Sequence, residues 1–154
     1  MKLGQLKNKI FAILGVDKSV DTGDLNYLID SAQRKAATLG KFIVKRSGAA
    51  LFKNGELNRD VLPEDFISAA GEKTYYAMPA QITDQTDDET ELGYDGMMAD
   101  ITAYGVAMEL CGKVYPSDVR KYMQIATEYD ERVSSLCARP VAVVHNGMFG
   151  RRGI

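Results

Sequence analysis

The chain has 154 residues, of which 45% are hydrophobic and 26% are charged, as is typical of one soluble globular domain with a modest core. No apolar run approaches the roughly 20 residues that a membrane-spanning helix requires. Residues 1–7 lack the apolar block and cleavage site of a secretory signal. We therefore expect a protein that folds in the cytoplasm where it is made, without a membrane partner. The net charge of −2 argues against a dedicated nucleic-acid binder.

The charges are distributed unevenly along the chain. Residues 1–60 contain eleven Lys and Arg against six Asp and Glu, a net of +5, whereas residues 61–138 contain five against fifteen, a net of −10. Residues 139–154 contain three Arg and no acid. Because unlike surfaces attract, an acidic middle with basic ends favours head-to-tail contact between copies. An ordinary solvated surface is the alternative interpretation.

Two helices are predicted in the N-terminal part of the chain. Leu3, Leu6, Ile10, Ile13 and Leu14 recur at three- and four-residue steps, which predicts a helix over residues 3–14 that ends at Gly15. A second helix is predicted over residues 23–39, where one face carries Leu25, Leu28, Ile29, Ala32, Ala36 and Leu39.

Residues 41–93 are predicted to form a β or loop insertion. Residues 42–44 favour a short strand or a further helical turn, and Asn54-Gly55 indicates a tight turn. Residues 72–78, bounded by glycine and proline, favour another strand. The polar residues 83–91 are expected to form an irregular loop, a feature that usually signals function or mobility.

Two further helices are predicted in the C-terminal half. The first has Asp95 as its N-cap, runs to Gly112 and carries on one face Met97, Ile101, Tyr104, Met108 and Cys111. Pro116 and Asp118 suit the start of the second, which ends at Arg139-Pro140. That helix carries a heptad seam of Val119, Tyr122, Ala126, Tyr129, Val133 and Leu136. We expect Tyr122, Tyr129 and Val133 to face the core of their own bundle.

The residue types that carry catalysis or bind cofactors are sparse. Residues 48–55 lack a phosphate-binding lysine motif, and the single histidine, His145, lies in the C-terminal tail. Cys111 and Cys137 are interpreted as small buried hydrophobic residues. Six carboxylates between Asp84 and Asp95 could bind calcium or act as paired acids, but their spacing does not match an EF-hand, so a solvated loop is favoured. We expect no enzymatic activity, no metal and no cofactor.

Four segments in succession resemble the head–tail connector (adaptor, or head-completion) proteins of tailed bacteriophages. Each motif alone is unspecific, and the resemblance depends on their order and spacing. The segments are Gly4–Val16 with its Leu-Gly ending, Leu25–Gly40 with the Ala32-Gln33-Arg34 centre, Thr86–Gly93 leading into Met97–Gly112, and Val114–Asp118 leading into the Tyr-rich helix over residues 119–138. Residues 41–83 have no counterpart in the resemblance.

The resemblance implies a mainly α fold, a bundle of about four helices over residues 1–139 with an insertion at 41–93 and an extended arm at 140–154. It also implies a place in the virion neck, in a ring commonly of twelve copies made in the bacterial cytoplasm. The implied partners are the portal protein, neighbouring copies, a downstream tail or nozzle protein, and passing double-stranded DNA bound without sequence specificity.

The C-terminal arm and the acidic loop are the candidate sites. The arm is expected to dock on the portal through Val141, Val143, Val144, Met148, Phe149, Arg151 and Arg152. Glycines at 147 and 150 would allow it to bend. The loop is expected to face the ring lumen or a neighbouring subunit through Asp84, Asp87, Asp88, Glu89 and Glu91.

Two other functions remain as alternatives. A small DNA-binding protein would use the first two helices as a helix-turn-helix, but their connector is longer than the usual three- to four-residue turn, and Asp24 and Asp30 would face phosphates. A cell-wall hydrolase would use carboxylates near Glu89 and Glu91.

Overall fold

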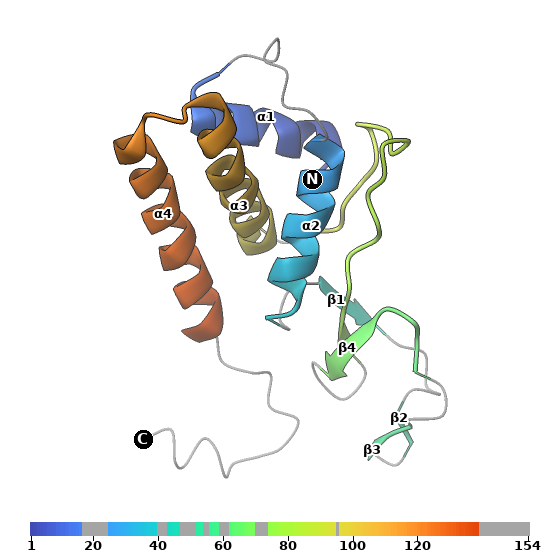
Figure 1. Cartoon of the computed structure of the whole chain (residues 1–154). Coiled ribbons are helices and arrows are strands. Elements are labelled where there is room, and N and C mark those ends of the chain that lie inside the picture. The colour runs from blue at the N-terminus through green and yellow to red at the C-terminus, as the bar shows by residue number, and fades with distance from the viewer. Residues whose placement is uncertain are drawn as a thin grey trace.

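The protein, described here by a computed structural model, has the mainly α fold that the sequence predicts (Figure 1). The structure describes residues 1–16, 25–39, 43–46, 52–53, 56–58, 62–69, 74–94 and 96–138. Within these residues there are four helices, α1 (Leu3–Leu14), α2 (Leu25–Ala37), α3 (Gly96–Val114) and α4 (Val119–Ala138). The predicted arm at residues 140–154, the Asn54-Gly55 turn and the Asp95 cap lie outside the described residues.

Helix α3 is the centre of the bundle, because it contacts α1, α2 and α4. Its buried residues are therefore spread around most of its circumference. The predicted single apolar face is wrong in this respect. Ile101 and Cys111 are fully buried, but Met97, Tyr104 and Met108 are only half-buried. A helix with neighbours on three sides buries residues on most of its surface, so its apolar residues do not form one stripe opposite a polar, solvent-facing side.

Helix α1 matches its predicted bounds and lies across one end of α3 (Figure 1). Leu3, Leu6, Ile10 and Leu14 are all fully buried against the C-terminal half of α3. Gly15 ends the helix at φ 71°, a left-handed conformation that glycine adopts without strain.

Helix α4 also matches its predicted bounds, but its inward face differs from the predicted heptad seam. Tyr129 and Val133 pack against the core and Leu136 is fully buried, as expected. Tyr122, however, is 41% exposed, so its predicted core position is wrong, and Ile125 is buried instead. A straight helix drifts by about 20° per heptad relative to a 3.5-residue repeat. The seam therefore coincides with the buried face only in the second half of α4.

The insertion contains more β-structure than the sequence indicates. Strands β1 (Ile43–Arg46), β5 (Thr74–Ala77) and β4 (Phe66–Ala69) form an antiparallel sheet in the order β1-β5-β4, and β2 (Phe52–Lys53) pairs with β3 (Glu56–Leu57). The strands near residues 42–44 and 72–78 were predicted, whereas β4 was not. Its register against β5 shifts between Phe66 and Ser68, and such a bulge interrupts the alternation by which strands are recognised.

The sheet packs against the lower end of the bundle and forms a second core with it. Tyr75 and Ala77 of β5 are buried beside Ala37, Met98 and Leu136, which come from three helices. The rings of Phe66 and Tyr75 stack with their centroids 5.7 Å apart. Strands β4 and β5 therefore share this second core with the C-terminal ends of α2 and α4 and the N-terminal half of α3.

A charged network connects three of the helices at the surface. Asp100 of α3 pairs with Lys9 of α1 and lies 3.8 Å from Nε of Arg132 of α4. Arg132 also pairs with Glu128, and its guanidinium lies 4.0 Å from the ring centroid of Tyr104. These contacts explain how a charged residue occupies the inward side of α4: its stem and planar head cover an aromatic ring.

Gly105 of α3 lies close to side chains of α4 and α2 and yields the first prediction. A Cβ at this position would lie 3.2 Å from Cε2 of Tyr129 and 3.8 Å from Cβ of Ala32. Gly105→Leu should therefore lower the free energy of unfolding by about 1–3 kcal/mol through overpacking. Gly112→Ala in the same helix, where an added Cβ meets nothing within 4 Å, should raise it by about 0.5–1 kcal/mol. Urea unfolding followed by circular dichroism measures both, and equal effects would contradict the packing explanation.

Candidate functional site

The segment that leads into the acidic loop, residues 80–83, lies on a row of polar side chains along α2. Asn26, Asp30 and Gln33 are spaced i, i+4 and i+7 and so share one helix face. Each binds a backbone group of the chain that leads into the loop: Asn26 Nδ2 donates to the Thr83 carbonyl at 2.8 Å, Asp30 Oδ1 accepts from the Ile82 N–H at 2.8 Å, and Gln33 Nε2 donates to the Ala80 carbonyl at 2.8 Å. The loop path is therefore set by side chains of a helix about fifty residues earlier.

Gln33, the last residue of this row, has no exposed surface. Its Nε2 also donates to Asp30 Oδ1 at 2.9 Å, and its Oε1 accepts a hydrogen bond from the Tyr94 hydroxyl. Burial raises the pKa of Tyr94, and the nearby charge of Asp30 raises it further. The Tyr94 hydroxyl therefore remains protonated at physiological pH and continues to donate its hydrogen bond to Gln33 Oε1.

Asp30 carries the negative charge of the network. Burial favours a higher pKa for its carboxyl group, but hydrogen bonds from the Ile82 N–H, Arg34 and Gln33, with the positive charge of Arg34, outweigh that effect. The pKa of Asp30 consequently lies below its ordinary value. Arg34 Nε donates to Asp30 Oδ2 at 2.8 Å, so both carboxylate oxygens have donors.

The far end of the loop binds the start of α1, in an arrangement that we call the clasp (residues 1–7 with residues 88–92). The Leu3 N–H donates to the Thr90 carbonyl at 3.0 Å and the Gly4 N–H to the Asp88 carbonyl at 2.8 Å. The Leu92 N–H donates in turn to the Met1 carbonyl at 3.0 Å. Backbone N–H groups at the start of a helix have no partner within the helix. Here two carbonyl groups of the loop accept hydrogen bonds from two of these N–H groups.

Three ion pairs reinforce the clasp and occupy three of the five predicted loop acids. Asp88 pairs with Lys7 at 2.7 Å, Glu89 with Lys2 at 2.5 Å and Glu91 with the Met1 amino group at 3.1 Å. Asp87 Oδ1 instead accepts the Glu89 N–H at 2.7 Å. Asp84 is exposed and has no ion pair with any described residue. The negative charges of these acids are also stabilised by the positive end of the α1 helix dipole, which lies at the start of the helix.

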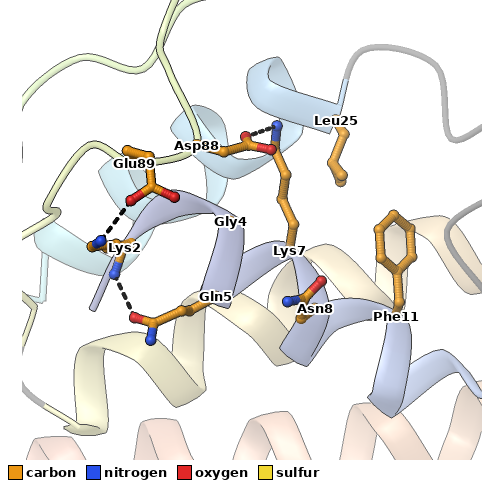
Figure 2. A pocket seen from close by; sticks show the side chains of 9 residues that line it. All are labelled: Lys2, Gly4, Gln5, Lys7, Asn8, Phe11, Leu25, Asp88 and Glu89. Carbon is orange, nitrogen blue, oxygen red and sulfur yellow. Dashed lines mark hydrogen bonds and ion pairs between the residues drawn. The ribbon is translucent and has the colours of Figure 1, made fainter.

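A pocket of about 470 Å³ lies beside the clasp, along the outer face of α1 (Figure 2). Figure 2 shows the Lys2–Glu89 and Lys7–Asp88 pairs at one end of the pocket and the side chains of Phe11 and Leu25 at the other. Asn8 lies between them. The pocket therefore has one charged end and one apolar end.

The first turn of α4 exposes an apolar surface, which we call the α4 patch (Val119, Tyr122 and Met123). These side chains are 68%, 41% and 56% exposed. Arg120, also exposed, lies among them. The ammonium group of the neighbouring Lys121 lies 4.1 Å from the centroid of the Tyr115 ring. Sequence analysis placed Val119 and Tyr122 on a buried seam and so missed this surface.

The remaining predicted site residues fall into two groups. Those of the arm, Val141–Arg152, lie outside the described residues, as does His145. Of the two cysteines, Cys111 is buried as predicted, whereas Cys137 is exposed, so the prediction is wrong there. Cys137 lies on the outer side of α4, next to the buried Leu136.

The geometry gives little support to the two alternative functions. Glu89 and Glu91 are 76% and 65% exposed, and each pairs with a cationic group of its own chain, so neither lies in the apolar pocket that holds a general acid in a carboxylate-pair enzyme. Asp30, which a helix-turn-helix would place near phosphate, is held in the α2 network. Within the described ranges, no three His, Cys, Asp or Glu side chains come together as metal ligands.

Comparisons with known proteins add no family assignment. No protein-family model, curated protein or solved structure matches the chain. Among the described helices, none combines the length and apolar character needed to cross a bilayer.

The close approach at Gly4 allows the clasp to be tested. A Cβ there would lie 3.2 Å from Cβ and 3.3 Å from the carbonyl oxygen of Asp88. Gly4→Val should therefore displace the loop and increase amide hydrogen exchange at residues 88–92 by at least about tenfold, the equivalent of 1.4 kcal/mol of local opening. Gly96→Val, at the start of α3 where an added Cβ meets nothing within 4 Å, is the matched control and should leave that exchange unchanged. Equal exchange in the two variants would contradict the clasp.

The lowered pKa of Asp30 predicts how stability depends on pH. Because the folded pKa lies below the unfolded value of about 3.8, the contribution is complete well above that pH and is lost as pH falls through the folded pKa. Asp30→Asn should therefore flatten the loss of stability below about pH 4 and lower stability at pH 7. Asp84→Asn, at an exposed acid without an ion pair to a described residue, is the control for the loss of one negative charge. Urea unfolding between pH 2 and pH 7 measures this, and an unaltered slope in Asp30→Asn would refute it.

Proposed function

We propose that this protein is a structural virion component that forms a ring adaptor between the portal and the tail of a tailed bacteriophage. The ring extends the DNA channel and completes the head after packaging. Its function is assembly and containment and requires no bond-making chemistry. The partners are the portal, neighbouring copies in the ring, and a downstream tail or nozzle protein.

One observation carries the proposal: the four segments that resemble head–tail connectors correspond to the four helices of a single bundle. The first two segments correspond to α1 and α2. The third contains the clasp residues 88–92 and leads into α3, and the fourth leads into α4. The unmatched residues 41–83 contain all five described strands. The resembling segments therefore coincide with the helical part of the fold and leave out the strands, which supports the proposal.

The arm supplies the portal contact in this proposal. It continues from the end of α4 and contains Val141, Val143 and Val144, followed by Met148 and Phe149. A β-branched segment can add backbone hydrogen bonds to the edge of another chain, and the two large apolar residues can fill pockets. Arg151 and Arg152 can pair with acids of the portal.

The acidic loop faces either the lumen or a neighbouring subunit in the proposed ring. Its own chain already neutralises Asp88, Glu89 and Glu91, which leaves Asp84 and Asp87 as the acids without a described cationic partner. Acids that faced the lumen would repel DNA phosphates and keep the DNA mobile.

Removal of the arm tests the proposed function. A truncation ending at Arg139 should keep the helical circular dichroism of the full chain, because the described core ends at Leu136. It should bind the portal protein encoded with it at least about tenfold more weakly, a loss of 1.4 kcal/mol or more. Electron microscopy and sedimentation of mixtures with purified portal measure docking.

Two controls complete the experiment. Met148→Ser with Phe149→Ser in the full chain should weaken docking, whereas His145→Ala should not, because the apolar pair is the proposed anchor. Docking by the truncation at full strength would show that the arm is misassigned. Failure of the full chain to dock on the portal would refute the adaptor function itself.

A further inference from the structure

We propose that residues 84–91, which we call the latch, lie closed on α1 at low salt and open from it as one unit when salt screens their charges. The rest of the bundle stays folded as they do so. Such opening does not depend on the adaptor function, and the isolated protein would show it.

The chain on both sides of the latch is held in the core. Gln33, which has no exposed surface, donates to the Ala80 carbonyl and accepts a hydrogen bond from the Tyr94 hydroxyl. One buried side chain therefore binds the chain before and after the latch. Ile82 is 4% exposed, and Leu92 packs against the core of the bundle. A surface segment whose ends lie close together and are fixed in this way has the form of an Ω-loop.

The latch itself buries no side chain. Seven of its eight residues are exposed, and the eighth, Thr86, is half-buried. All eight are polar or acidic, so the latch has no apolar residue to place in the core. The hydrophobic effect, which holds the helices and both ends of the loop, therefore contributes little to keeping the latch closed.

Contacts with the start of α1 hold the latch closed. Two backbone hydrogen bonds join them, and Glu89 and Asp88 pair with Lys2 and Lys7 (Figure 2). Three of these four side chains are at least 43% exposed. Exposed ion pairs are weak in water and weaken further as salt is added. The first N–H groups of a helix can bind water in place of the loop carbonyls. The contacts that close the latch are thus the ones in this region that salt affects most.

Helix α1 does not need the latch to stay in place. Leu6, Ile10 and Leu14 are fully buried in a core that α1 shares with α3. Opening therefore removes few buried contacts, and it releases Asp88 and Glu89 from their lysines while the helices keep their packing. The position of these acids consequently depends on the ions and charged surfaces around the protein.

Amide hydrogen exchange of the folded chain, measured residue by residue by NMR, tests the latch. The Leu3 and Gly4 N–H groups report on it, because they donate to latch carbonyls and lose this protection when it opens. The Ile82 N–H, which donates to Asp30, reports on the fixed end. Raising NaCl from about 0.01 M to about 1 M shortens the Debye length from about 30 Å to about 3 Å. Exchange at Leu3 and Gly4 should then rise at least about threefold relative to exchange at Ile82.

Two variants of α1 separate the ion pairs from the rest of the helix. Lys2→Gln with Lys7→Gln removes both lysines that pair with the latch. Exchange at the two reporter amides should then be fast already at low salt and should respond to salt by less than about twofold. Lys9→Gln is the matched control, because Lys9 belongs to the same helix but pairs with Asp100 of α3. It should keep the full salt response.

Three results would contradict the latch. Exchange at Leu3 and Gly4 that does not change with salt would show that the ion pairs do not hold the loop closed. An equal rise at Ile82 would show that the fixed end opens together with the latch. Loss of the salt response in Lys9→Gln would assign the response to α1 as a whole. The salt series uses the unaltered chain, so it can refute the proposal even if a variant fails to fold.

Discussion

The fold depends on one constraint: residues 78–94 have almost no secondary structure of their own, yet their backbone groups need hydrogen-bond partners where they lie against the helices. Two helices supply those partners. The polar row of α2 binds the carbonyls and N–H groups of residues 80–83, and the first turn of α1 binds those of residues 88–92. The connection between the sheet and α3 is thereby held along its length, and the exposed acids are presented from a fixed position.

The clasp gives hydrogen-bond partners to backbone groups of both α1 and the loop. Its stability comes mainly from the burial of apolar side chains. Leu3 is fully buried, and Leu92 packs against the same core. The three ion pairs involve exposed carboxylates, and such pairs contribute about 0.2–1 kcal/mol each. Their effect is better described as specificity: they determine which part of the loop meets which turn of α1. The same side chains then form the charged end of the pocket.

Sequence periodicity predicted the helices well, because α1 and α4 bury residues at regular steps and their bounds agree with the structure. It did not identify the row of Asn26, Asp30 and Gln33. Polar residues on one helix face look solvent-exposed in a sequence unless their partners, here the backbone of residues 80–83, are known. Nor did it find the α4 patch, because apolar residues at heptad spacing look the same whether or not a partner covers them. The spacing i, i+4, i+7 of the row was the available signal.

The contrast between α3 and α4 links this error to the proposed assembly. Helix α3 has neighbours on three sides and leaves few apolar side chains exposed, whereas α4 packs mainly on α3. The apolar residues of the first turn of α4 exceed what this bundle can bury. A subunit that acted alone would gain solubility from polar residues at positions 119, 122 and 123. Their exposure beside Arg120 is what a surface covered by another polypeptide in the proposed assembly requires.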